Sequence, residues 1–233
     1  MARIKKITKK KLKEPDEFIS LTEKAYRFIS QYLKPMVTGG IILLVVVLAI
    51  ILFQKWEKRK EVDADQKFNA AVHLYQEVSS PYREGSPLEY RNVSEKLDEV
   101  ITKFPRTSSA KLSPLYKGNI HLQLGEFGEA IKEYQACLNK AGKVKLYRLL
   151  AMEGMGYAYE GMKDYEKALH AYQKILEMGE SFESADAYLN IGRCYEKLGK
   201  NKEALENYQA FLKISEKSLV ANSVLRKISL LGK

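Results

Sequence analysis

A continuous apolar run near the start of the chain constrains the fold more than any other feature. Residues Met36 to Phe53 read MVTGGIILLVVVLAIILF and contain no charged side chain. As an α-helix this run extends roughly 27 Å, close to the hydrocarbon core of a bilayer, which is about 30 Å thick. A helix of a globular core usually shows a polar face every third or fourth residue, and this run shows none. The run therefore predicts a transmembrane helix over residues 36–54.

A cleaved signal peptide fits the same run less well, because the segment before it is long and the sequence QKWEKRK after it lacks an Ala-x-Ala cleavage site. Charge predicts the orientation. Residues 1–35 carry ten lysines and arginines against four acidic residues, and short cation-rich segments stay in the cytoplasm. The basic residues just after the run favour the opposite orientation, but a long domain crosses regardless of its charge. We expect the N-terminus in the cytoplasm and the C-terminal domain outside.

The basic tail, residues 1–35, accounts for most of the net charge of the chain. It contributes +6, ten cations minus four anions, to a total of +10. Beside a membrane span, we expect this tail to meet anionic lipid or only to fix the topology, and we expect no nucleic-acid partner. An amphipathic pattern over residues 16–33 favours a helix that lies on the cytoplasmic leaflet or docks onto a cytoplasmic loop of a partner. The alternative is a loosely ordered tail.

The C-terminal half of the chain repeats itself three times. Each copy has a lead glycine, a polar turn and an Ala-x3-Tyr-x3-Leu pattern, and the lead glycines stand 38 and 36 residues apart. A period of this size is typical of antiparallel helix pairs stacked into a solenoid. We expect each glycine to let the alanine of the second helix approach closely, and each tyrosine to fill the space between hairpins. The glycine, alanine and tyrosine positions are Gly118, Ala130 and Tyr134; Gly156, Ala168 and Tyr172; and Gly192, Ala204 and Tyr208.

These positions resemble the tetratricopeptide repeat family, although the copies are longer than the usual ~34 residues and lack the closing proline. Helical spacing predicts a juxtamembrane helix and a degenerate repeat within residues 55–110, and a capping helix over residues 215–231. The predicted fold is therefore all-α: a tetratricopeptide-like helical solenoid with one N-terminal transmembrane helix. The three clear repeats and the C-terminal capping helix occupy residues 111–233.

Residue types that carry catalytic or metal chemistry are scattered. His73, His121 and His170 lie far apart, and no metal-ligand spacing such as His-x3-His or Cys-x2-Cys occurs. Cys137 and Cys194 stand at helical positions that hold core residues in other copies, so we expect buried thiols rather than a redox motif or a disulfide. We predict no enzyme activity, no metal and no cofactor.

A concave surface lined by helices is typically used to bind proteins. We expect the first helix of each copy to line this surface, in a groove of mixed polar and aromatic character that suits extended or partly unfolded polypeptide. The alternative is that these side chains are merely solvated. The predicted groove residues are Leu115, Asn119, Gln123, Glu153, Tyr157, Glu160, Leu189, Arg193 and Glu196.

The order of these parts resembles the YfgM-like family of bacterial inner-membrane proteins, with motifs that are specific only for the repeats. The resemblance implies a single-pass protein with a periplasmic C-terminal domain that is ancillary to the SecYEG translocon. Its partners would be translocon subunits, periplasmic chaperones or exported polypeptides. Two alternatives stay open: an adaptor for envelope, polysaccharide or cell-division assembly, and a chaperone that holds unfolded clients directly.

Overall fold

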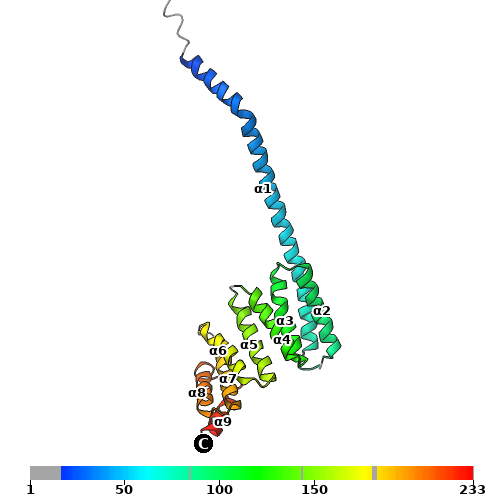
Figure 1. Ribbon diagram of the computed structural model, residues 1–233, viewed down its shortest axis with the longest axis vertical. Coiled ribbons are helices and arrows are strands. Elements are labelled where there is room, and N and C mark those ends of the chain that lie inside the picture. The colour runs from blue at the N-terminus through cyan, green and yellow to red at the C-terminus, as the bar shows by residue number, and fades with distance from the viewer. Residues whose placement is uncertain (1–16, 84, 143, 180–182, 233) are drawn as a thin grey trace, which may run out of the picture. The chain divides into compact units, whose positions relative to one another are not determined.

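The computed structural model describes residues 17–83, 85–142, 144–179 and 183–232 (Figure 1). Within these residues the protein is all-helical, with α-helices α1 to α9 and no strand. This confirms the predicted fold class. The chain divides into two compact units, Met1–Lys58 and Arg59–Lys233. The first sixteen residues of the basic tail, and the predictions made for them, lie outside the described part.

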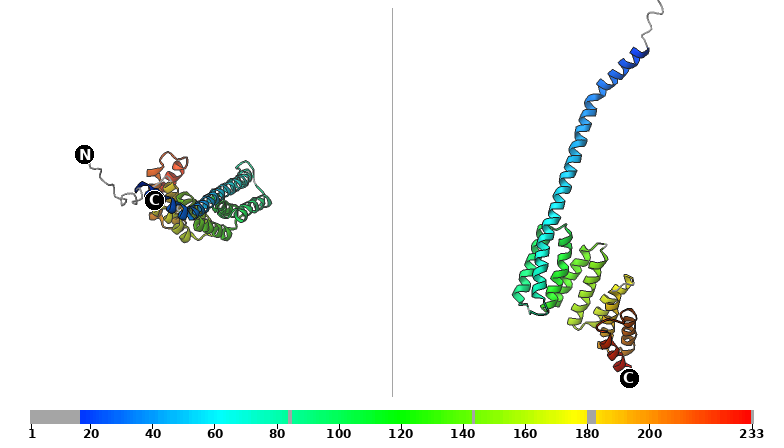
Figure 2. Two further views of the ribbon diagram at one scale, coloured as in Figure 1. Left: turned by 90° about the horizontal axis from the view of Figure 1, so that it is seen from above. Right: turned by 180° about the vertical axis from the view of Figure 1, so that it is seen from behind.

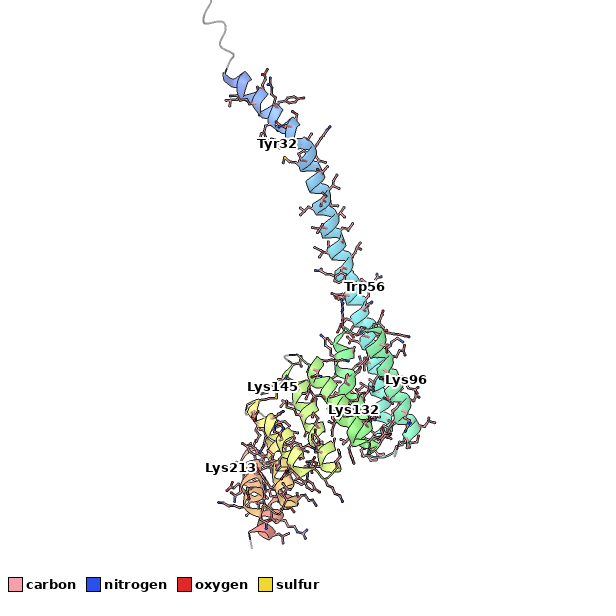
Figure 3. All side chains as sticks on the ribbon, viewed as in Figure 1. Tyr32, Trp56, Lys96, Lys132, Lys145 and Lys213 are labelled. Atoms are coloured by element: carbon pink, nitrogen blue, oxygen red, sulfur yellow. The ribbon has the colours of Figure 1, made fainter. Side chains whose placement is uncertain are left out.

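The described part of the first unit is a single stretch of helix. It belongs to α1 (Glu17–Val78), which continues into the second unit. Every side chain from Leu21 to Arg59 is exposed, and Figure 3 shows these side chains, Tyr32 and Trp56 among them, standing out from the ribbon. The helix is long and apolar enough to cross a membrane. The described part of the predicted amphipathic segment, residues 17–33, lies in its N-terminal part.

The second unit is a stack of helical hairpins (Figures 1 and 2). The C-terminal part of α1 packs with α2, α3 with α4, α5 with α6, and α7 with α8, and α9 follows as a single helix. Their bounds are α2 (Pro87–Lys103), α3 (Ser108–Gln123), α4 (Phe127–Lys140), α5 (Lys145–Gly161), α6 (Tyr165–Glu177), α7 (Glu183–Lys197), α8 (Asn201–Ile214) and α9 (Ala221–Leu231).

The first hairpin is held together by apolar side chains at helical spacing. Phe68, Ala71 and Val78 of α1 are buried against Val93 and Leu97 of α2 and against the start of α3. The sequence also specifies where α2 begins. A serine caps its N-terminus in a reciprocal capping box with a glutamate three residues on, and a proline occupies the first turn.

The hairpins do not stack evenly. The backbones of α3, α5 and α7 approach one another closely in succession, whereas within the described residues the backbone of α6 makes no such close approach to that of α4 or α8. The first helices therefore lie closer together than the second helices. The stack curves so that α3, α5 and α7 form an inner surface, and α4, α6 and α8 form an outer surface.

The last helix covers the end of the stack. Val224 is buried, and Ile228 and Leu231 pack against the buried rings of α8. The predicted capping helix was too long at its start, because residues 215–220 form turns and α9 begins at Ala221. Val220, which precedes α9, is correspondingly exposed.

Both cysteines are buried, as expected, and both are free thiols. Cys137 lies in the cluster between α3, α4 and α5, and Cys194 lies in the next cluster along the stack. Burial raises the pKa of the Cys137 thiol to about 11 and that of Cys194 to about 12. Neither thiol is a nucleophile at neutral pH, because only the thiolate reacts.

Candidate protein-binding surface on the inner helices

A tyrosine closes each junction between one copy and the next. Tyr134, Tyr172 and Tyr208 are completely buried. Each ring packs with both helices of its own hairpin and with the first helix that follows: α5, α7 and α9 respectively. The prediction that these rings fill the space between hairpins is confirmed.

The lead glycines make room for these rings. A Cβ on Gly118 would lie 2.5 Å from the Tyr134 ring, and a Cβ on Gly156 would lie 2.3 Å from the Tyr172 ring. Gly154 approaches Tyr134 from the following copy, where a Cβ would lie 2.3 Å from the same ring. The nearest atoms therefore belong to tyrosines, not to the alanines that the sequence suggested. At these places any larger residue collides with a ring that has no space to move into.

The buried hydroxyl groups point at side chains of the inner helices. Tyr172 Oη donates to Glu160 Oε1 at 2.6 Å, and Tyr208 Oη donates to Glu196 Oε2 at 2.5 Å. Tyr134 Oη donates to Asn119 Oδ1 at 2.7 Å. Each tyrosine is thus tied to its own hairpin by a hydrogen bond as well as by packing. Burial raises the pKa of all three phenols, so they are donors at any physiological pH.

Two of these acceptors also bind a cation on the first helix after their own hairpin. Arg193 of α7 donates through Nε and Nη2 to the two oxygens of Glu160, at 2.7 Å each. Lys227 of α9 donates to Glu196 Oε2 at 2.6 Å. The hydrogen bonds to Glu160 raise the pKa of Arg193. The Lys227 link joins the last copy to α9. The Arg193 link joins successive copies on the inner surface and has the bidentate geometry of the stronger ion pairs.

A third link between copies is a hydrogen bond between two neutral side chains, Tyr157 and Asn190. Tyr157 Oη of α5 donates to Glu153 Oε1 at 3.0 Å and accepts a hydrogen bond from Asn190 Nδ2 of α7 at 3.3 Å. Burial raises the pKa of Tyr157 to about 12 and raises that of the Glu153 carboxyl, against the opposing effect of the Tyr157 hydrogen bond. Asn190 and Lys227, which complete these links, were not recognised from the sequence.

The structure brings most of the predicted groove residues together on the inner surface, but only some of their side chains are exposed to a partner. Leu115 is buried in the core around Tyr134, and Leu189 is partly buried around Tyr208. Gln123 is exposed, and Tyr157 exposes 36% of its surface. Glu153 accepts a hydrogen bond from Tyr157, and the remaining polar members bond to one another, to Lys227 or to buried tyrosines. The inner surface is therefore stiff, with few side chains that must be ordered when a partner binds.

The described residues contain no group of three or more His, Cys, Asp or Glu side chains placed to hold a metal ion. A curved stack of helical hairpins with a bonded polar inner surface defines a helical-repeat protein of the scaffold class. Residues 27–233 match the model of the tetratricopeptide repeat-like domain. The chain belongs to this family, whose domains generally bind protein partners.

The chain is 26% identical to the human (Homo sapiens) intraflagellar transport protein 88 homolog over 141 residues, which is 54% of this chain. It spans only 17% of the length of that relative. A tetratricopeptide repeat protein from Parabacteroides merdae has a similar fold, with a TM-score of 0.55, 20% identity and coverage of 72% of this chain and 60% of that one. The nearly identical repeats of a candidate kinesin light chain from Podospora anserina also have a similar fold, with a TM-score of 0.54 and 15% identity. This match covers 72% of this chain and 84% of that one.

Proposed function

We propose that the chain is a membrane-anchored scaffold that holds other proteins beside a membrane, ancillary to the Sec translocon and to periplasmic chaperones during protein export. One observation carries the proposal: the uncovered apolar stretch and the first helix of the first hairpin are parts of a single helix, Glu17–Val78. The mechanism is tethering. Anchoring a binding domain raises the local concentration of its partner at the membrane without new chemistry.

The proposed location is a bacterial inner membrane, crossed once, with the N-terminus in the cytoplasm and the repeat domain in the periplasm. The cations of the N-terminal tail support this orientation, and anionic lipid would meet the tail there. Protease added to intact spheroplasts tests the arrangement. We expect the repeat domain to be digested from outside, and the same protease should reach the tail only after detergent lysis. A repeat domain that survives in intact spheroplasts would overturn the orientation.

The proposed working surface is the inner one, with Gln123 and Tyr157 as its most accessible predicted residues. Photo-crosslinking amino acids at these two positions in living cells test it, with Gln209 on the exposed outer face of α8 as the matched control. We expect adducts with translocon subunits or periplasmic chaperones from the inner positions and none from Gln209.

Each other outcome replaces the proposal. Adducts with envelope-assembly or cell-division proteins would identify an assembly adaptor instead. Adducts with many different exported chains would identify a chaperone that holds clients directly. Adducts from Gln209 alone would show that the inner surface is not the binding surface.

A further inference from the structure

The outer surface of the stack carries a hollow that the inner network leaves untouched. It lies between α4 and α6, with α5 as its floor, and its volume is about 290 Å³. Sites for drug-sized ligands range upward from roughly 300 Å³. The hollow therefore suits one or two apolar side chains better than a whole small molecule.

The floor of the hollow is apolar and adaptable. Met152 and Met155 contribute to it together with the ring of Tyr159. Met152 is buried, whereas Met155 and Tyr159 keep part of their surface open. Unbranched methionine side chains adjust to partners of different shape, which is why they recur on protein-binding surfaces.

The rim of the hollow is basic. Lys167, His170 and Lys174 stand three and four residues apart on one face of α6, and all three line the hollow. Lys167 bonds to Asp164 Oδ2 at 2.6 Å. Among the described residues, neither His170 nor Lys174 has a bonded partner, so the positive charge of Lys174 is not neutralised within the fold.

The neighbouring copy shows that the repeat itself does not require this chemistry. Relative to the alanine of each pattern, the positions of Lys167, His170 and Lys174 correspond to Glu203, Glu206 and Ala210 of α8. The floor changes as well, because Met155 corresponds to Ile191, which is buried. The basic rim and the open methionine floor thus belong to one place in the stack, although every copy has the same backbone plan.

We propose that this outer hollow docks an acidic, amphipathic segment of a partner protein. One or two large apolar side chains of the segment lie on the methionine floor, and its carboxylates face Lys174, His170 and Lys167. Charge complementarity selects this occupant, because a neutral or basic segment would leave the basic rim unpaired. The inference rests on the proposed scaffold function and adds to it a second surface with a partner of defined chemistry.

Fluorescence anisotropy with the full chain in mild detergent tests the proposal. The probe is a fluorescein-labelled helical peptide with leucines on one face and glutamates beside them, and the comparison peptide carries lysine at every glutamate. The test variant is His170→Glu with Lys174→Ala, which installs the residues of α8 and preserves the Asp164–Lys167 pair. The matched control is Glu203→Lys with Glu206→Lys. Circular dichroism verifies that both variants keep the helical content of the parent.

We expect the acidic peptide to bind the parent and the control alike, and to bind the rim variant at least about tenfold more weakly. The lysine peptide should bind none of them. No binding of the acidic peptide to the parent, or equal binding to parent and rim variant, would overturn the proposal. So would self-association of the chain that the rim variant abolishes, because the occupant would then be a second copy.

The two proposals fail separately. Crosslinks from Tyr157 in cells report on the inner surface, and Tyr157 is not among the residues that line the hollow. If they persist while the acidic peptide does not bind, the outer hollow has no such partner and the scaffold function stands. If peptide binding is intact but no protein crosslinks from the inner surface in cells, the inner surface is not the binding surface. The proposal for the outer hollow then still stands.

Discussion

The junctions after the first and second full copies are built on the same ring but use different polar partners. Tyr134 donates to the neutral amide of Asn119, whereas Tyr172 donates to Glu160, which also binds Arg193 of the next copy. The residue that corresponds to Glu160 in the first copy is Leu122, so no carboxylate is present there. The ring and its glycine are therefore what the fold requires, and the hydrogen-bond partner varies around them.

The largest effect should come from what the two junctions share. Gly156→Ala places a Cβ 2.3 Å from the Tyr172 ring, and overpacking at a fully buried ring costs about 3 kcal/mol. The matched control is Gly128→Ala in α4, where a Cβ would meet nothing within 4 Å. Since alanine favours helix, the control should be neutral or stabilising by up to about 1 kcal/mol. Urea unfolding of the full chain in detergent, followed by circular dichroism, measures both. Equal effects would refute the role of the glycine.

The next effect should separate the junctions. Arg193→Met leaves Glu160, whose side chain is only 15% exposed, without its cation. Removing one partner of a buried ion pair costs 3–5 kcal/mol, and we expect about 2 kcal/mol because Arg193 is partly exposed. Asn119→Ala only leaves the Tyr134 hydroxyl without an acceptor, which costs about 1 kcal/mol. The same urea titration compares them. A second substitution, Glu160→Gln, should recover part of the Arg193→Met loss. In the Asn119 variant it should lower the stability further, because Arg193 then loses its carboxylate partner.

Removing the hydroxyl groups sharpens the same contrast. Tyr172→Phe deletes a hydrogen bond to a carboxylate and Tyr134→Phe deletes one to an amide, while both rings keep their packing. Hydrogen bonds to charged groups contribute about 1.5–3 kcal/mol and neutral ones about 1 kcal/mol, so we expect the larger loss at Tyr172. Thermal unfolding of the two variants side by side decides the order. A larger loss at Tyr134 would show that the charge of Glu160 adds nothing.

The turns of the two copies also differ, with a smaller consequence. Lys163 has φ of +61°, and Gly125 and Gly199 occupy the same place in the other turns, each with φ of +72°. A left-handed conformation costs a non-glycine residue about 1–2 kcal/mol. Glycine avoids this cost, but it loses more conformational entropy on folding, which offsets part of the gain. We expect Lys163→Gly to raise the free energy of unfolding by about 1 kcal/mol, and Gly125→Lys to lower it similarly. A loss of stability on Lys163→Gly would contradict the assignment.

The smallest expected effect extends the comparison to the third junction. Burial alone would raise the pKa of Glu196, but hydrogen bonds from Lys227 and Tyr208 outweigh it and lower the pKa below its ordinary value of 4.5. A carboxyl whose pKa is lowered by folding stabilises the protein above its unfolded pKa, and this contribution is lost as the pH falls through the folded pKa. At pH values below 4.5, the free energy of unfolding of the parent chain should therefore decrease. In Glu196→Gln this part of the drop should be absent, and an unchanged pH profile would dismiss the link.

The positions that bury apolar surface could be predicted from the sequence. The hydrogen bonds and ion pairs around them could not. Glycine, alanine and tyrosine recur because every hairpin meets the same packing problem, so their period is visible. Tyr172 and Glu160 meet only once two helices have a definite register. One signal was available: Glu160 and Arg193 stand four and one residues after the lead glycines of successive copies, with opposite charges.

The other missed features depend on quantities that a repeat pattern does not contain. Lys227 lies on α9, which begins later than its hydrophobic spacing suggested, so its register was not known. The outer hollow depends on side-chain volume and burial, since Met155 and Ile191 both count as apolar residues in a pattern. Only the structure shows that one of these positions is open and the other is filled.

The buried state of Cys137 and Cys194 has a practical consequence for testing the proposed membrane arrangement. The sequence contains only these two cysteines, and neither is available to a maleimide in the folded protein, because both are buried and protonated. The unaltered folded chain should therefore take up no maleimide label and can serve as the negative control. A single cysteine introduced at an exposed position would label against no background, and no cysteine-free variant has to be engineered first.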